Sequence, residues 1–260
     1  MATIKIATWN VNSVRARLPV VCGWLKEAAP DIALLQEIKC TAETFPRSEI
    51  EDLGYNVAIR GQKNFNGVAM LAKRPIEDIT TELPGEPSDE QARYIEAFVA
   101  GLRVASIYLP NGNPAPGEKF DYKLKWLGRL YEHVRSLLAL DEAFVLGGDY
   151  NVIPENKDCH DPASWVGDAL FRPESRSLYR LILHLGMTDA FRALNPDTQA
   201  YTFWDYQAGA WQRDHGIRID HLLLSPQAAD RLEAAGIDRA MRGKDKASDH
   251  VPTWCTVGDG

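Results

Sequence analysis

Ala143-Phe144-Val145-Leu146-Gly147-Gly148-Asp149-Tyr150-Asn151 is the stretch of this sequence that decides the fold. A short apolar run of this kind is typical of a buried β-strand. It stops at two glycines, and a carboxylate and an amide follow two residues apart. Because residues i and i+2 of an extended chain point the same way, Asp149 and Asn151 should project together from the strand end. Such a pair suits the holding and deprotonation of a water molecule, although an ordinary Asp/Asn turn explains this stretch alone equally well.

The same pattern, an apolar strand with polar residues at one end, recurs along the chain. It is found in Ile4–Asn12 with Asn10, Asp31–Glu37, Val104–Asn111, Ile217–Leu224 with Asp220, and Ser248–Pro252 with Asp249 and His250. A carboxylate inside a buried run is costly unless it is paired or binds a metal. Polar tips on this many strands therefore predict one shared rim.

The periodicity predicts many strands and few helices. Strand patterns fall near 3–9, 31–36, 55–60, 67–73, 76–82, 94–99, 102–109, 143–149, 201–206, 217–224, 237–242 and 250–257. Helical spacing is clearest over 118–139, with shorter helices expected at 18–28, 47–53, 174–185 and 226–235. This balance favours two packed sheets with helices outside. The absence of a linker, a low-complexity tract or a strong repeat predicts one domain over 1–260.

Composition narrows the class of protein. With 260 residues and 45% hydrophobic side chains there is ample material for a core, and no stretch reaches the roughly 20 apolar residues of a membrane span. The first strand pattern begins almost at once, which predicts no signal peptide. The four cysteines are scattered without a CxxC pair, which disfavours a zinc site and suits a reduced, cytoplasmic protein. A net charge of −7 argues against a DNA-coating protein but not against an enzyme whose acidic residues surround a cation.

Seven motifs in order resemble the exonuclease III family of abasic-site (AP) endonucleases, within the endonuclease/exonuclease/phosphatase superfamily. They are TWNVNSVRAR at 8–17, LLQEIK at 34–39, YLPNG at 108–112, GGDYN at 147–151, YTFWDY at 201–206, GIRIDHLLLS at 216–225 and SDHVP at 248–252. The resemblance covers nearly the whole chain. It implies an α/β fold of the DNase I-like type, a four-layer α/β/β/α sandwich of two packed mixed sheets flanked by helices.

The resemblance also implies a reaction and its partners. The expected activity is Mg²⁺-dependent hydrolysis of the phosphodiester 5′ to abasic sites, with Mn²⁺ as a substitute ion. Exonuclease action in the 3′-to-5′ direction and removal of 3′-phosphates are expected at the same centre. The implied partner is double-stranded DNA with abasic sites or blocked 3′ ends. A monomer with no obligate protein partner and no membrane association is expected.

The metal ligands are expected among residues with oxygen donors. Glu37 is the leading candidate, because a hard carboxylate oxygen suits Mg²⁺, which binds through one or two carboxylates and keeps several waters. Asn10, Asp149, Asn151 and Asp249 complete the candidate set. Asn10 would position Glu37, a bound water or the nucleophile without adding charge.

Asp149 is the candidate general base, and Asn151 would orient the water or the phosphate. By resemblance to the family, the partner that fixes the tautomer of His250 is Asp220. His250 would donate to a phosphate oxygen or serve as the base itself, and the sequence leaves both roles open. Tyr108 and Asn111, which follow the strand pattern at 102–109, would contact the phosphate and steady developing negative charge.

The substrate pocket is expected to be aromatic and apolar. Phe203, Trp204 and Trp211 precede Asp220 and could stack on a base or line a pocket for a sugar that lacks its base, although core positions explain Phe203 and Trp204 equally well. Ile217 stands where some family members place a Trp, and Arg213 is a candidate phosphate contact. The aperiodic segment 152–173, with Trp165, is long enough to suggest a functional loop.

Other functions remain open. The same centre could process 3′ ends with little action on abasic sites. A related hydrolase could cleave inositol phosphates or sphingomyelin, although no lipid-facing segment is present. A non-catalytic relative would bind nucleic acid or a regulatory protein, but such relatives typically lose acidic site residues that this sequence keeps.

Overall fold

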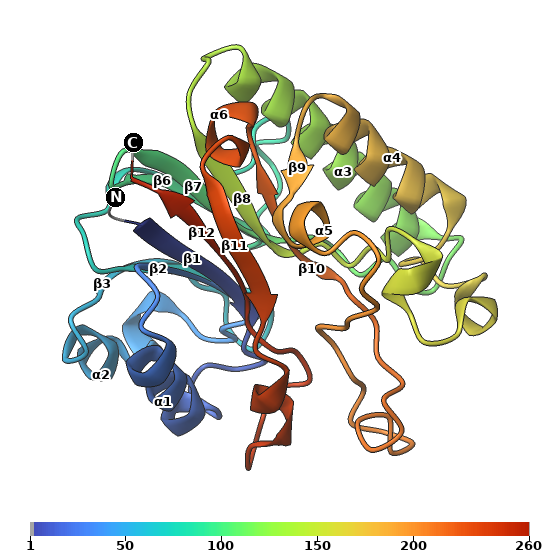
Figure 1. The fold of residues 1–260 in the computed structure, drawn as a ribbon, viewed down its shortest axis with the longest axis horizontal. Coiled ribbons are helices and arrows are strands. Elements are labelled where there is room, and N and C mark those ends of the chain that lie inside the picture. Colours follow the sequence, from blue (N-terminus) through green and yellow to red (C-terminus); the bar gives the residue numbers. More distant parts are fainter. Residues whose placement is uncertain (1–2, 260) are drawn as a thin grey trace.

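The computed structural model describes residues 3–259 and contains two six-stranded sheets. The first sheet has the order β11-β12-β1-β2-β4-β3 and the second has the order β5-β6-β7-β8-β10-β9. Helices cover the outer face of each sheet, so that the molecule has four layers (Figure 1). The predicted four-layer sandwich of two mixed sheets is confirmed.

The first sheet is built mainly from the N-terminal part of the chain. Its strands are β1 (Thr3–Asn10), β2 (Ile32–Gln36), β3 (Asn56–Arg60), β4 (Val68–Ala72), β11 (Leu232–Ile237) and β12 (Thr253–Gly258). Strands β1 and β2 are parallel, and α1 (Leu18–Ala28) makes the crossover between them. Helix α2 (Arg47–Glu51) follows on the same face, after the 3₁₀ turn η1 (Ala42–Thr44).

The second sheet repeats this plan. Its strands are β5 (Glu77–Thr80), β6 (Tyr94–Val99), β7 (Leu102–Tyr108), β8 (Phe144–Asp149), β9 (Thr188–Asp189) and β10 (Asp220–Leu224). Strands β7 and β8 are parallel and are joined by the long helix α3 (Glu118–Leu138). Helix α4 (Pro173–His184) packs beside α3. The shorter helical elements are α5 (Ala190–Leu194), α6 (Pro226–Ala229), η2 (Asn156–Asp158), η3 (Pro162–Trp165) and η4 (Arg239–Gly243).

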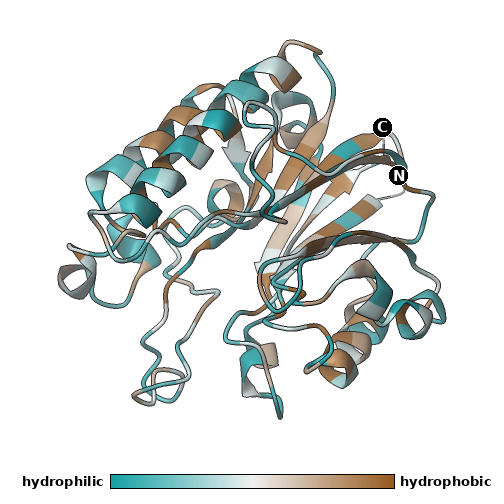
Figure 2. Cartoon of the chain, turned by 180° about the vertical axis from the view of Figure 1, so that it is seen from behind, coloured by the Kyte–Doolittle hydropathy of each residue, from teal (hydrophilic) through white to brown (hydrophobic). Residues whose placement is uncertain are grey.

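Four apolar cores are found among residues 3–259, of which the central one lies between the two sheets and a small one includes Ile217 and Ile219. The central core includes Ile6, Leu34, Val104, Val145 and Leu222, all of them buried. Separate cores join the first sheet to α1 and α2 and the second sheet to α3 and α4. Figure 2 shows hydrophobic positions along the central strands. Along the helices, hydrophobic and hydrophilic positions alternate.

Strand alternation decides which polar residues end up at the seam between the sheets. In β1, Ile6 belongs to the core between the sheets, so Asn10, four residues later, lies on the same face. In β8, Val145 belongs to the same core, so Asp149, four residues later, also lies on the face between the sheets. These two polar residues therefore lie at one end of the seam.

The two glycines of β8 are required for this approach. A Cβ on Gly147 would lie 2.6 Å from Leu222 Cδ2 on the neighbouring strand β10 and 2.7 Å from Leu34 Cδ1 on the facing sheet. A Cβ on Gly148 would lie 2.0 Å from the carbonyl oxygen of Ile107. The glycines thus let the sheets close just before Asp149.

Three predicted elements were wrong. Residues 201–206 form no named strand, although Phe203 makes single bridges to Ile217 and His250. The helix predicted at 226–235 ends at Ala229, and Leu232–Ile237 is instead strand β11, paired with β12. The strand predicted at 237–242 is the 3₁₀ turn η4. In the 226–235 segment, pairing with an adjacent strand overrode the helix propensity of an Ala-rich sequence.

Within residues 3–259, no helix is both long and apolar enough to cross a membrane.

Candidate active site

The ends of several strands meet at one rim, as the sequence predicted. Asp149 at the end of β8 pairs in register with Asp220 at the start of β10 and with Tyr108 at the end of β7. Asn10 ends β1 on the facing sheet, and Glu37 directly follows β2. A cavity of about 250 Å³ opens at this rim. Its lining includes Glu37, Tyr108, Asn111, Asp149, Asn151, Phe203, Ile217, Asp249 and His250.

Asn10 joins the two sheets across the site. Its fully buried Nδ2 donates to Glu37 Oε1 at 2.9 Å and to Asp149 Oδ2 at 3.0 Å. Its Oδ1 accepts the backbone N–H of Asn12 at 3.1 Å. Asn10 therefore bridges the two carboxylates as a hydrogen-bond donor, and its oxygen faces away from them rather than towards a shared cation.

Glu37 is held in a left-handed backbone conformation, with φ of 50°. The hydroxyl of Tyr108 donates to Glu37 Oε1 at 2.9 Å, and the ammonium of Lys39 lies 2.7 Å from Oε2. Burial alone would raise the pKa of Glu37, but Lys39 and the Asn10 hydrogen bond outweigh it and lower the pKa. Glu37 is thus a carboxylate held in its charged form, beside a cation.

His250 lies between two acids. Its Nδ1 is 2.9 Å from Asp220 Oδ2, and its Nε2 is 3.8 Å from Asp149 Oδ2. Since a carboxylate only accepts, Nδ1 of His250 carries a proton. The partnership of His250 with Asp220, rather than with its neighbour Asp249, is as the sequence predicted.

Burial and neighbouring charges shift the pKa values of His250 and Asp149. Burial disfavours the imidazolium, but Asp220 and Asp149 raise the pKa of His250 to about 10. Burial, with an added contribution from Asp220, raises the pKa of Asp149 to about 7 despite the nearby His250. At neutral pH the site therefore holds a protonated histidine beside a carboxyl group that can gain or lose a proton.

The amides after β7 and β8 are tied to each other. Asn111 Nδ2 donates to Asn151 Oδ1 at 3.2 Å, and Asn151 Nδ2 donates to the carbonyl of Leu109 at 2.9 Å. Below them, the buried ammonium of Lys123 donates to the carbonyls of Asn111 at 3.0 Å and Asn151 at 2.5 Å. Burial lowers the pKa of Lys123 to about 7. Lys123, on α3, was a candidate phosphate contact in the sequence, and its helical spacing gave no sign that it is buried against these carbonyls.

The pocket also contains residues that were not among the predicted site residues. Asn113, Trp165, Asp168, Leu170, Asp205 and Ile219 contribute to its lining. Asp168 accepts from Asn113 Nδ2 at 3.1 Å and from the N–H of Leu170 at 2.8 Å. The length of the aperiodic segment 152–173 was the one signal for this wall of the pocket.

Some of the predicted aromatic and cationic substrate contacts line the pocket, and others do not. Phe203 lines the pocket with its ring 4.9 Å from that of His250, and Ile217 lies beside it. Trp204 was predicted wrongly as a substrate contact: it is fully buried, and its Nε1 donates to Asp214 at 2.9 Å. Trp211 packs edge-on against Trp204, 5.0 Å between centroids, outside the pocket lining. Arg213 is exposed and donates to the carbonyl of Ala208, also outside the lining.

A larger cavity, about 450 Å³, lies between α1 and residues 241–246. It is lined by Val20, Trp24 and Met241 with a few charged side chains at the edge. None of the paired acids, amides or the histidine of the rim is among its lining residues. The acids, amides and histidine predicted to act in catalysis therefore lie at the smaller, polar cavity.

The residues present fit a metal ion with hard oxygen ligands. Asp149, Asp220 and His250 offer ligand atoms that all lie within 4.8 Å of one another. Asp220 Oδ1 is buried and has no hydrogen-bond partner, and Glu37 already lies against one cation. Because a protonated imidazole cannot ligate, the carboxylates are the better donors in this group.

The matching family model spans residues 7–250 and describes the endonuclease/exonuclease/phosphatase family. The chain belongs to that family.

Individual relatives agree. The chain is 33% identical to exodeoxyribonuclease III of Haemophilus influenzae over 96% of this chain and 98% of that protein. It superposes on an AP endonuclease from Archaeoglobus fulgidus with a TM-score of 0.93 and 40% identity, covering 97% of this chain and 98% of that one. It superposes on the 3′ phosphatase NExo from Neisseria, bound to a product DNA hairpin, with a TM-score of 0.95 and 37% identity, over 98% and 99% of the two chains.

This member of the endonuclease/exonuclease/phosphatase family is therefore a nuclease, related to exodeoxyribonuclease III and the AP endonucleases. The resemblance that the motifs indicated is confirmed, and so is the enzyme class. The individual roles of the rim residues stay predictions.

Proposed function

We propose that this nuclease is a Mg²⁺-dependent DNA repair enzyme that hydrolyses the phosphodiester on the 5′ side of an abasic site. The same centre would remove nucleotides and phosphates from 3′ ends. The observation that carries this proposal is the pairing of His250 and Asp149 at the mouth of a small pocket walled by Phe203 and Ile217.

Asp149 would act as the general base. Its carboxylate is fixed from two sides, by Asn10 at Oδ2 and by the N–H of Asn151 at Oδ1, 2.9 Å away. A fixed carboxyl group with its pKa near neutrality can take a proton from an attacking water and release it afterwards. The new bond joins that water oxygen to phosphorus, and the bond to the 3′-oxygen breaks.

His250 would act as the donor to the phosphate rather than as the base. Asp220 holds its Nδ1, which leaves Nε2 on the side of Asp149 and the pocket. Its raised pKa keeps it protonated at neutral pH, which suits a group that stabilises negative charge. Tyr108 and Asn111, on the next strand end, would contact the same phosphate.

The metal would be held by Glu37, with Asp249 and the amide oxygen of Asn151 available nearby. A bound Mg²⁺ would supply electrostatic stabilisation of the charge on the phosphate and on the leaving oxygen. Asn10 would keep Glu37 and Asp149 at a fixed separation through its paired donor bonds.

The shape of the cavity supports a sugar without a base. At about 250 Å³ the cavity is below the usual size range of a ligand site, and Ile217, Ile219 and Phe203 form its apolar wall. A deoxyribose could enter, whereas a base would have to displace this wall. The AP endonuclease from Archaeoglobus fulgidus, at 40% identity, points to the same substrate.

A second function has support of its own. The 3′ phosphatase NExo resembles this chain as closely in structure as the AP endonuclease does. The enzyme would then process 3′ ends and act little on abasic sites. The cavity and its chemistry would be unchanged, because both reactions break a bond to phosphorus.

The deciding experiment uses two labelled duplexes, one with a single abasic-site analogue and one with a 3′-phosphate. Each is incubated with Mg²⁺ and separately with EDTA. The variant Asp149→Asn is compared with Asp230→Asn, which makes the same chemical change at an exposed position. We expect a Mg²⁺-dependent nick 5′ to the abasic site, absent in Asp149→Asn and normal in Asp230→Asn.

The outcomes separate the proposals. Loss of the 3′-phosphate without a nick would favour 3′-end processing. Full cleavage in EDTA would contradict the metal dependence, and normal cleavage by Asp149→Asn would contradict the base assignment. No reaction with either duplex would overturn both functions.

A further inference from the structure

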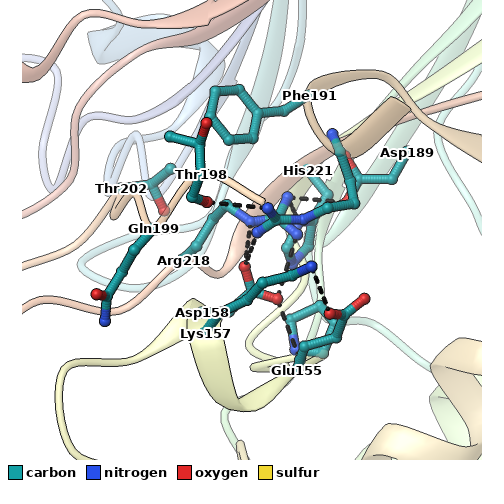
Figure 3. Close-up of polar contacts among 12 residues, drawn as sticks. Glu155, Lys157, Asp158, Asp189, Phe191, Thr198, Gln199, Thr202, Arg218 and His221 are labelled. Atoms are coloured by element: carbon teal, nitrogen blue, oxygen red, sulfur yellow. Dashed lines mark hydrogen bonds and ion pairs between the residues drawn. The ribbon is translucent and has the colours of Figure 1, made fainter. Parts of the chain in front are cut away.

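A second group of buried charges lies behind the pocket and takes no part in the proposed chemistry. It consists of Arg218, Asp158, Asp189, Arg192 and His221, and is called the Arg218 cluster here. Figure 3 shows the guanidinium of Arg218 with Asp158, Asp189 and His221 around it. Arg218 is 1% exposed.

Every nitrogen of the Arg218 guanidinium has a partner. Nε and Nη2 donate to the two oxygens of Asp158, at 2.7 and 3.3 Å, and Nη1 donates to Asp189 Oδ2 at 2.8 Å. Arg192 adds a bond to Asp158 at 2.6 Å. Two guanidinium groups thus face two carboxylates, and the cluster is balanced in charge.

The contacts fix the tautomer of His221. An arginine has no acceptor, so His221 Nδ1, 2.9 Å from Arg218 Nη1, must accept. The proton then lies on Nε2, which donates to the carbonyl of Val152 at 3.2 Å. Val152 directly follows Asn151, so Arg218 reaches the backbone beside the proposed catalytic amide through one histidine ring.

The same arginine sits within the wall of the pocket. Its neighbours Ile217 and Ile219 both line the cavity. The N–H of Arg218 donates to the carbonyl of Asp158 at 2.8 Å, and the N–H of Tyr150 donates to the carbonyl of Ile219 at 2.9 Å. Backbone and side chain of Arg218 therefore tie the same two segments together.

Regular sheet does not hold this region. Ile217 makes only single bridges, to Cys159 and Phe203, and β10 begins at Asp220. A buried ion cluster is weak evidence for stability, because apolar replacements of similar volume are often as stable. Its presence where the backbone is irregular points to a role in fixing position.

We propose that Arg218 is a positioning residue of the nuclease, which sets the pocket wall at Ile217 and Ile219 against the strand end that carries Asp149 and Asn151. This inference rests on the proposed function. Three chain segments meet at its guanidinium: 152–158 through Asp158 and His221, 188–189 through Asp189, and its own segment. Without it, the bound phosphate and the groups that act on it lose their alignment.

The test compares Arg218→Met and Arg218→Lys with a matched pair, Arg103→Met and Arg103→Lys. Arg103 also lies against a buried carboxylate, Glu96, at 3.1 Å, but at the start of β7, the opposite end from Tyr108. For Arg218→Met we expect kcat on the preferred duplex to fall about 100-fold, the usual cost of a misplacement of roughly 1 Å. KM should stay within about threefold, since Arg218 lies behind the pocket and is not among its lining residues.

The lysine variants keep the comparison informative if a methionine variant does not fold. Arg218→Lys keeps the charge and one ion pair, so it should recover about tenfold of the lost kcat. Both Arg103 variants should retain kcat within about twofold. A normal kcat in folded Arg218 variants, an equal loss in the Arg103 variants, or a loss confined to KM would overturn the proposal.

A readout independent of activity separates this inference from the proposed function. Hydrogen exchange should accelerate at the amides of Tyr150 and Ile153 in the Arg218 variants and not in the Arg103 variants. If the wild type cleaves neither duplex, the proposed function fails and this measurement still decides the positioning role. Unchanged exchange at these amides would overturn it.

Discussion

The two buried charge clusters differ in whether every carboxylate oxygen finds a hydrogen-bond partner within the protein. In the Arg218 cluster each carboxylate oxygen of Asp158 and Asp189 accepts at least one hydrogen bond. In the pocket cluster (Asn10, Glu37, Asp149, Asp220 and His250) the Oδ1 of Asp220 has none. Groups left without a partner in a buried site are available for an ion or a substrate, whereas satisfied ones fix structure.

The histidines of the two clusters make the same contrast, His221 within β10 of the second sheet and His250 just before β12 of the first. His250 faces two carboxylates, which outweigh burial and raise its pKa to about 10. His221 is buried beside the Arg218 guanidinium, and both effects lower its pKa to about 4. The imidazole of His250 is therefore a charged hydrogen-bond donor, whereas that of His221 is neutral and joins Arg218 to the carbonyl of Val152. Both rings are buried.

The largest expected effect comes from removing the acid of the pocket cluster. Asp149→Asn should lower kcat by about 1000-fold or more, because the general base is lost. Its thermal midpoint at pH 8 should be unchanged or higher, because burial and Asp220 disfavour the ionised carboxylate that the amide replaces. Calorimetry and single-turnover cleavage measure both quantities, and a marked loss of stability would erase the contrast between the clusters.

The matching change in the Arg218 cluster should lower the folding stability, which Asp149→Asn should leave unchanged or raise. Asp158→Asn leaves Arg218 and Arg192 facing one carboxylate, which should cost about 3–5 kcal/mol of folding free energy. Urea unfolding at pH 7 measures this loss. Stability equal to that of the wild type would show that the cluster tolerates an unpaired cation.

The smallest expected effect is a loss of folding stability at acidic pH. Burial would raise the pKa of Asp158 and Asp189, but Arg218 outweighs it and both lie below the usual value of 3.8. A lowered pKa in the folded state means that the unfolded chain binds more protons as the pH falls through this range. Their stabilisation is present above about pH 4 and lost below it.

Unfolding by urea between pH 5 and pH 2.5 should follow this slope in the wild type. Asp189→Asn, which removes one of the titrating groups, should show a shallower dependence. An identical slope in both proteins would assign the acid sensitivity to other carboxylates.

Local patterns in the sequence were sufficient for much of the fold. Helix α1 was predicted at its observed bounds, and the strand predicted at 143–149 differs from β8 by one residue. Where the prediction was wrong, at 226–235, an Ala-rich segment took the structure that its neighbour β12 offered. Propensity is a local property, and strand pairing depends on what lies alongside.

The sequence by itself determined the family and the polar strand ends, because each is carried by residues within short motifs, and the resemblance to that family implied the partnership of His250 with Asp220. Tertiary structure alone decided that Trp204 is core, that Lys123 lies under the two amides, and that Arg218 joins three segments behind the pocket. Those contacts join residues as far as 60 positions apart. A burial environment of that kind comes into being only when the sheets close, so no local pattern records it.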